Sequence, residues 1–224
     1  MKRLAQVSIV AACLATACQR QAFAEAAIAT PAAAVEARET QGLKTAIFAG
    51  GCYWGVEGVF SHVRGVTSAV SGFEGGSADT AHYERVSEGD TGHAESVRVT
   101  YNPAVVRYDQ LLQVFFGVIA DPTELDFQGP DTGTQYRSAL VPLSPEQRRV
   151  AAGYLAQLKV LKLWRRPIVT AIEPYRGFYP AARDHQDFMQ KNPDHPYIVM
   201  WDKPKVAALR RLFPALYKAS FTAG

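Results

Sequence analysis

The residues of this sequence best suited to chemistry surround one cysteine. Cys52 lies in the stretch GGCYWGVEG, between two glycines and the aromatic pair Tyr53 and Trp54. The 224-residue chain has two other cysteines, Cys13 and Cys18, and both lie near its N-terminus. Outside this N-terminal segment, the chain has no second cysteine that could pair with Cys52 in a disulfide framework, a CxxC pair or a zinc site. Cys52 is either an inert buried residue or a reactive thiol.

The elements expected around Cys52 favour a reactive thiol. Residues 44–49 are apolar and precede two glycines, as in a buried strand that ends in a tight turn. Residues 52–63 have the apolar spacing of an amphipathic helix. A thiol in the first turn of a helix faces unpaired N–H groups and the positive end of the helix dipole, which favour the thiolate. The glycines allow a ligand to approach closely, and the two aromatic rings offer it apolar surfaces.

The remaining elements predict an α+β domain. Strands are expected at 66–73, 94–101, 136–140 and 168–172, and helices at 108–116, 145–163, 181–191 and 205–218. Ser144 and Pro145 are a typical start for the helix at 145–163. Because helices and strands do not alternate strictly, we expect a two-layer α+β sandwich rather than a parallel sheet with crossover helices.

The N-terminus has the features of an export signal. Residues 1–3 carry two positive charges, residues 4–17 are mostly apolar, and residues 22–24 fit a small-x-small cleavage site. We therefore expect a signal peptide at 1–24, cleavage after Ala24 and a periplasmic protein. A retained membrane anchor is less favoured, because a spanning helix needs about 20 apolar residues. The alternative is a lipoprotein anchored at Cys18, because the preceding residues partly match a lipoprotein cleavage box.

The remaining composition indicates one globular domain. Residues 25–42 are rich in alanine, which predicts a linker or disordered arm, followed by a single catalytic domain at 43–218 and a tail at 219–224. The chain is 48% hydrophobic and 20% charged, as in ordinary globular proteins. Its net charge of +3 is scattered along the sequence, so we expect no nucleic-acid partner.

Five segments of the domain match one family in their order and spacing. They are GGCYWGVEGVF, SGFEGG, HYERVSEGDTGHAESVRVTYNP, DPTELDFQGPDTGTQYRS and FYPAARDHQDFMQKNPDHPYIV. Together they resemble the peptide methionine sulfoxide reductase A family over residues 45–216. The combination of GCYWG, TGHAE and GTQYRS is highly specific. The resemblance implies a ferredoxin-like mixed sheet packed by helices, and reduction of the S epimer of methionine sulfoxide, free or in proteins.

The resemblance also implies roles for seven residues. Cys52 matches the family nucleophile, which attacks the sulfoxide sulfur and becomes a sulfenic acid. Glu95 matches the carboxyl group that protonates the oxygen, and this role needs a pKa raised by apolar surroundings. The substrate-binding residues implied are the aromatic pair that holds the methyl group, two tyrosines that bind the oxygen, and an aspartate that lines the site: Tyr53, Trp54, Tyr83, Tyr136 and Asp131.

Two features depart from the family pattern. Tyr53 stands where phenylalanine is commoner, and it adds a hydroxyl near the sulfur. Many members carry resolving cysteines near the C-terminus, but this chain has no cysteine after Cys52. An external thiol must then reduce the sulfenic acid, and the expected partners are thioredoxin, glutaredoxin, glutathione or dithiothreitol. We expect no other cofactor, no metal and a monomer.

Other functions could use the same residues. His93 or His185 could activate Cys52 in a hydrolase, but the local signatures of thiol proteases are missing. A thiol peroxidase would use Cys52 on peroxide and leave sulfoxides untouched, and a noncatalytic periplasmic module would bind without turnover. The aspartates between 121 and 131 are not spaced as in a calcium loop, so a metal site is not predicted there.

Overall fold

The centre of the fold is a βαββαβ unit. The structure, a computed structural model, describes residues 27–224, so the predicted signal peptide with Cys13 and Cys18 lies outside the described residues. The unit consists of β1 (Lys44–Gly50), α2 (Tyr53–Ser61), β2 (Val66–Glu74), β3 (Ala94–Tyr101), α4 (Tyr108–Val114) and β6 (Ser138–Val141). Its strands lie in the order β6-β1-β3-β2, and all of these neighbours are antiparallel.

Two short strands complete the sheet at its edges. β7 (Ala171–Ile172) pairs parallel with β6, and β8 (Phe178–Pro180) pairs antiparallel with β2. The six-stranded sheet is therefore mixed, and the predicted α+β fold is confirmed. A separate hairpin of β4 (Phe127–Gln128) and β5 (Asp131–Thr132) stands beside it.

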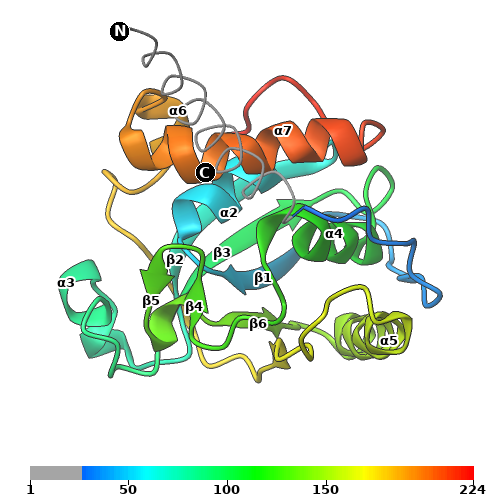
Figure 1. Cartoon of the computed structure of the whole chain (residues 1–224), viewed down its shortest axis with the longest axis horizontal. Helices are drawn as coiled ribbons and strands as arrows, with labels where there is room; N and C mark the ends of the chain where they lie inside the picture. Colours follow the sequence, from blue (N-terminus) through cyan, green and yellow to red (C-terminus); the bar gives the residue numbers. More distant parts are fainter. Residues whose placement is uncertain (1–26) are drawn as a thin grey trace, which may run out of the picture.

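An aromatic cluster joins the helices to one face of the sheet. The ring centroid of Phe48 on β1 lies 4.7 Å from that of Phe60 on α2, 5.9 Å from Tyr108 on α4 and 5.6 Å from Phe115. Outside this layer, α6 (Phe188–Lys191) and α7 (Lys203–Leu212) cover α2, and α5 (Pro145–Leu161) packs against α4 (Figure 1). Eight of the nine residues of α2 are buried, so the helix that begins after Cys52 is held from both sides.

Most predicted elements are confirmed to within a few residues, and the Ser144 side chain caps α5 by accepting the Gln147 N–H. The predicted helix at 181–191 is largely wrong, because α6 begins only at Phe188. Asp187 has a φ of +53°, and the Gln186 amide bonds both backbone groups of Ser71, which pulls the chain out of helical geometry.

Several short elements were not predicted. They are the π-helical turns η2 (Phe115–Ile119) and η4 (Ile198–Asp202), the 3₁₀ turns η1 (Ala78–Thr80) and η3 (Thr134–Tyr136), and α3 (Tyr83–Val86). The predicted helix at 205–218 is α7, which begins directly after η4 and stops before Pro214. Of these elements, η2 and η4 line a cavity at Cys52, and α3 and η3 carry Tyr83 and Tyr136.

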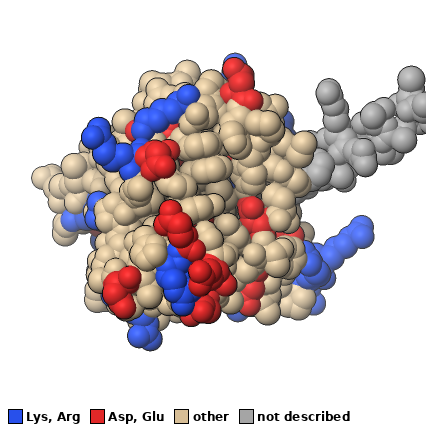
Figure 2. All heavy atoms as spheres, turned by 90° about the vertical axis from the view of Figure 1, so that its left-hand side faces the viewer, with Lys and Arg blue, Asp and Glu red and all other residues tan. Residues whose placement is uncertain are grey.

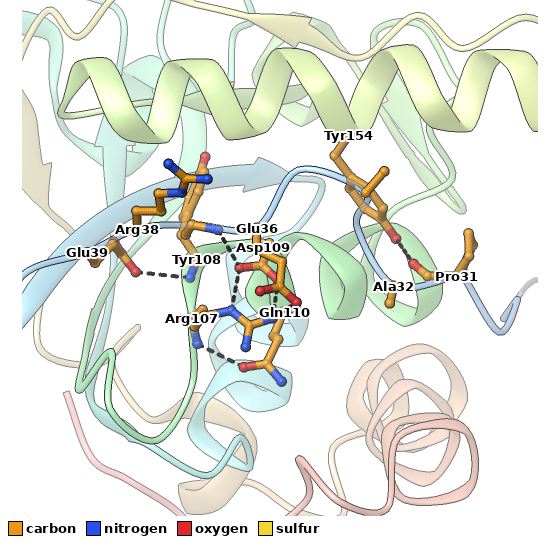
Figure 3. A network of polar contacts seen from close by, with 12 residues as sticks. Pro31, Ala32, Glu36, Arg38, Glu39, Arg107, Tyr108, Asp109, Gln110 and Tyr154 are labelled. Carbon is orange, nitrogen blue, oxygen red and sulfur yellow. Dashed lines mark hydrogen bonds and ion pairs between the residues drawn. The ribbon is translucent and has the colours of Figure 1, made fainter.

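Residues 27–42 lie along the domain, although their composition predicted a linker or disordered arm (Figure 3). The carbonyl of Pro31 accepts a hydrogen bond of 2.7 Å from the Tyr154 hydroxyl, and Ala37 N–H donates to the Asp109 carboxylate at 2.9 Å. The carboxylate of Glu39 accepts the Tyr108 N–H. The predicted tail at 219–224 is also bound, because Thr222 N–H donates to the carbonyl at position 61. Side chains of α4 and α5 bind the N-terminal segment. The sequence of residues 27–42 alone does not predict these contacts.

The Asp109 contact gives a test of this packing. The carboxylate is buried and also pairs with the Arg107 guanidinium at 2.8 Å. Asp109→Ala should lower the free energy of unfolding by about 2 kcal/mol, because two donors lose a charged acceptor. Asp194→Ala is the matched control: that side chain is 97% exposed and 3.9 Å from Lys203, so its loss should change stability by less than about 0.5 kcal/mol. Urea denaturation of both variants measures the difference, and equal stabilities would contradict the packing role.

Charges of both signs are mixed on one face of the molecule. On the face in Figure 2, Lys and Arg residues are interspersed with Asp and Glu residues. Within residues 27–224, no helix has the length and apolar character needed to cross a bilayer.

Candidate active site

Cys52 lies at the junction of β1 and α2, as the sequence predicted. Gly51 before it has a φ of +87°, and a β-carbon there would lie 2.6 Å from the Gln128 side chain. The glycine therefore permits both the turn and the close approach of the β4–β5 hairpin. The Cys52 residue is 9% exposed, and its sulfur accepts the backbone N–H of Trp54. Cys52 is thus a nearly buried residue that lines a cavity.

Glu95, the second residue of β3, lies against the start of α2. Its carboxyl accepts the Tyr53 N–H at 2.9 Å and so takes one of the unpaired donors of the helix. Burial nevertheless raises the pKa of Glu95 to about 8, in spite of this hydrogen bond. The side chain is therefore largely protonated at neutral pH, which is the state that a proton donor needs.

The thiol is less acidic than its place at a helix start predicted. Burial and the charges of Glu95 and Asp202 raise the pKa of Cys52 well above its usual range, and they outweigh the N–H of Trp54. When Glu95 is protonated, its part of this effect is absent. Burial therefore opposes the thiolate that the start of the helix favours, and the thiol lies beside a carboxyl group of raised pKa.

Tyr83, Tyr136 and Asp131 reach the site from α3, η3 and β5, three separate segments. Burial raises the pKa of each, and the charge of Glu95 raises the pKa of both tyrosines further. The hydroxyls therefore remain neutral donors at physiological pH. The Asp131 carboxylate accepts a hydrogen bond from Tyr197. The structure thus brings these three predicted residues to Cys52 and Glu95.

The aromatic pair is held by a segment of the chain that comes much later. The buried Tyr53 hydroxyl hydrogen-bonds Nδ1 of His185 at 2.8 Å. The indole of Trp54 stacks on Phe188, with centroids 3.7 Å apart and planes 6° from parallel. The His185 ring also lies 4.6 Å from that of Tyr83. The sequence analysis did not assign Phe188 to the site. Its position in residues 178–199, one of the five segments that resemble the family, could have indicated such a role.

Neither histidine supports a hydrolase. His93 uses both ring nitrogens, because Nδ1 meets the Gly76 N–H at 3.2 Å and Nε2 meets the Ser77 carbonyl at 2.9 Å. His185 is bonded to Tyr53 through Nδ1. Within residues 27–224, no group of three or more His, Cys, Asp and Glu residues is arranged to hold a metal ion.

Two further buried carboxyl groups lie at α2: Asp202 packs against this helix, and Glu57 belongs to it. Asp202 lies against Gly55, where a β-carbon would come within 2.2 Å of Oδ1, so the glycine makes room for it. Burial raises the pKa of Asp202 to about 6, and Lys205 Nζ lies 3.7 Å away. Glu57 accepts the Asp187 N–H at 2.9 Å, and burial raises the pKa of Glu57 to about 8. Sequence reasoning assigned neither group, because their partners are distant in the chain.

Comparison with known proteins agrees with this geometry. The family model described as "Peptide methionine sulfoxide reductase" matches residues 44–215. A relative from Mesorhizobium japonicum, peptide methionine sulfoxide reductase MsrA 2, is 56% identical over 183 residues, which are 82% of this chain and 94% of that protein. The chain belongs to the peptide methionine sulfoxide reductase A family. The resemblance seen in the five segments is thereby confirmed.

Solved structures of peptide methionine sulfoxide reductases share the fold. Reduced Mxr1 from Saccharomyces cerevisiae superposes with a TM-score of 0.62 at 32% identity, over 72% of this chain and 92% of that one. Methionine sulfoxide reductase A of Corynebacterium diphtheriae gives 0.58 at 36% identity, over 69% and 77%. The chain is therefore an oxidoreductase that reduces methionine sulfoxide, which disfavours the peroxidase and the noncatalytic module.

Proposed function

We propose that this enzyme reduces the S epimer of methionine sulfoxide, free or in proteins, with Cys52 as nucleophile and Glu95 as proton donor. The observation that carries the proposal is the buried carboxyl group of Glu95, whose pKa burial raises to about 8, next to a buried thiol at a helix start. The choice of the S epimer rests on the resemblance to the peptide methionine sulfoxide reductase A family.

The proposed chemical step needs no proton from solvent. The sulfur of Cys52 attacks the sulfoxide sulfur while Glu95 protonates the sulfoxide oxygen. The thiol proton passes to the carboxylate of Glu95. The protonated oxygen then moves from the substrate sulfur to the Cys52 sulfur, which breaks the substrate S–O bond and the bond between the two sulfurs. The products are a thioether, which is methionine, and the sulfenic acid of Cys52. This order of steps also explains how a thiol of raised pKa reacts, because the thiol proton leaves as the bond between the two sulfurs forms.

The neighbouring groups suit a sulfoxide. The hydroxyls of Tyr83 and Tyr136 stay protonated and can donate to its oxygen, and they gain strength as negative charge develops there. The rings of Tyr53 and Trp54 present apolar surface next to the sulfur for the methyl group. Their orientation is fixed by His185 and Phe188.

We further propose that an external thiol completes the cycle. Within the described residues, Cys52 is the one free cysteine, and the sequence has none after it. A first thiol molecule condenses with the sulfenic acid to give a mixed disulfide and water. A second thiol releases Cys52 and leaves as the disulfide. Thioredoxin, glutaredoxin, glutathione and dithiothreitol are all chemically competent reductants.

Mass spectrometry after one turnover tests this cycle. When the full-length, uncleaved protein reacts with methionine sulfoxide without reductant, we expect a mass gain of one oxygen on Cys52. Subsequent addition of glutathione should convert it to a mixed disulfide, and dithiothreitol should restore the thiol. A disulfide that joins Cys52 to Cys13 or Cys18 would contradict external recycling.

The place of action is proposed from the N-terminal sequence. Residues 1–24 support export to the periplasm, where the enzyme would act as a monomer on oxidised exported proteins. The intact mass of the protein from cells distinguishes cleavage after Ala24 from a lipid anchor at Cys18.

A further inference from the structure

A cavity of about 570 Å³ leads away from Cys52 between the β4–β5 hairpin and the helices η4 and α7. Its apolar lining includes Val118 and Ile119 of η2, Met200 of η4 and Ala208 of α7. Glu95, Tyr83 and Tyr136 are not among the residues that line the cavity. The cavity therefore extends beyond the groups assigned to the sulfoxide itself.

We propose that this cavity binds the residues next to methionine sulfoxide in a peptide substrate and favours apolar side chains at those positions. The inference rests on the proposed function, because it requires the sulfoxide sulfur to be held at Cys52. With the sulfoxide sulfur held at Cys52, the main chain of the substrate lies at the mouth of the cavity. The side chains of the residues next to methionine sulfoxide can then enter the cavity.

The walls suit an apolar side chain. Val118, Ile119 and Ala208 have small exposed fractions and form a preformed apolar floor, whereas Met200 is 56% exposed at the rim. A leucine side chain placed between floor and rim removes apolar surface of both partners from water. The volume lies in the range that small-ligand cavities occupy, which leaves room for more than one side chain.

The charges in this cavity are compatible with a peptide main chain. With Glu95 protonated, the charged groups that act on the Cys52 thiol are the carboxylates of Asp202 and Asp131, which both oppose a negative charge there. Two cations line the cavity, Lys205 and Arg211, together with the carboxyl groups of Asp121, Glu124 and Asp131. Lys205 is paired with Asp202 at 3.7 Å. The main chain of a peptide is neutral, so it can lie beside these carboxylates without charge repulsion.

Two variants in one helical turn test the proposal. Met200→Glu places a charge on the rim of the cavity. Val199→Glu is the matched control, because its side chain is 49% exposed in the same turn η4 but does not line the cavity. The substrates are acetylated and amidated pentapeptides whose S-methionine sulfoxide is flanked on both sides by leucine or by glycine. A third substrate, N-acetylmethionine sulfoxide methylamide, lacks flanking residues.

We expect the wild-type kcat/KM to be about tenfold higher for the leucine peptide than for the glycine peptide. Met200→Glu should reduce this ratio to below about twofold, and Val199→Glu should retain it. All three proteins should reduce the methylamide equally. A wild-type ratio near one, or an unchanged ratio in Met200→Glu, would overturn the proposal, as would a Met200→Glu effect confined to the KM of the reductant. Failure of the wild-type enzyme to reduce the methylamide would instead count against the proposed function.

Discussion

Replacing Cys52 with serine is expected to lower the rate of methionine sulfoxide reduction by at least about 10⁴-fold, the scale on which enzymes lose activity without their nucleophile. A serine hydroxyl has nearly the same size, but its oxygen is a far weaker nucleophile toward sulfur. The backbone N–H of Trp54 can still be satisfied by the new hydroxyl, so the fold should persist. Steady-state assays with dithiothreitol as reductant measure the loss.

The other cysteines provide the matched control for this variant. Cys13→Ser and Cys18→Ser together should leave kcat and KM unchanged, because the proposed cycle uses neither thiol. Urea denaturation of the Cys52→Ser protein checks that its loss of activity is not unfolding. Appreciable activity in a correctly folded Cys52→Ser protein would refute the proposed mechanism.

Glu95→Gln is expected to slow the chemical step by about 10² to 10⁴-fold, the range typical of losing a general acid. The amide oxygen can still accept the Tyr53 N–H, so the start of α2 keeps its geometry. What disappears is the proton that the sulfoxide oxygen takes up. Single-turnover kinetics under saturating substrate isolate this step from recycling.

The same residue sets the pH dependence of the reaction. The pKa of Glu95 is raised to about 8, so the donor is protonated below that pH and loses its proton above it. We expect kcat/KM for the sulfoxide to fall as the pH rises through about 8 in the wild-type enzyme, and Glu95→Gln to lack this fall. A rate that increases through pH 8 would contradict the role of Glu95 as the proton donor.

Glu57→Gln is the matched control for this profile. Burial raises the pKa of Glu57 to about 8 as well, but its carboxyl bonds the Asp187 N–H and does not act on the Cys52 thiol. The decline near pH 8 should therefore remain in Glu57→Gln. If the decline disappeared in Glu57→Gln, the group that titrates near pH 8 would be Glu57 and not Glu95.

Local sequence patterns determined much of the fold. The strand, glycine turn and helix around Cys52 were predicted within two residues, as were β3 and the start of α5 with its Ser144 cap. These features depend on neighbouring residues, through backbone sterics, apolar periodicity and end capping. The motifs that carry Cys52, Glu95 and the two tyrosines also identified the family before their geometry was known.

Tertiary structure alone decided the properties that depend on distant partners. The thiol of Cys52 is less acidic than its helix position predicts, because burial and the charges of Glu95 and Asp202 outweigh the helix terminus. Residues 27–42 are bound through side chains such as Asp109, and the α6 segment is shaped by the pairing of Gln186 with β2. Desolvation and charge depend on which groups the fold brings close together, and local sequence patterns do not determine that set.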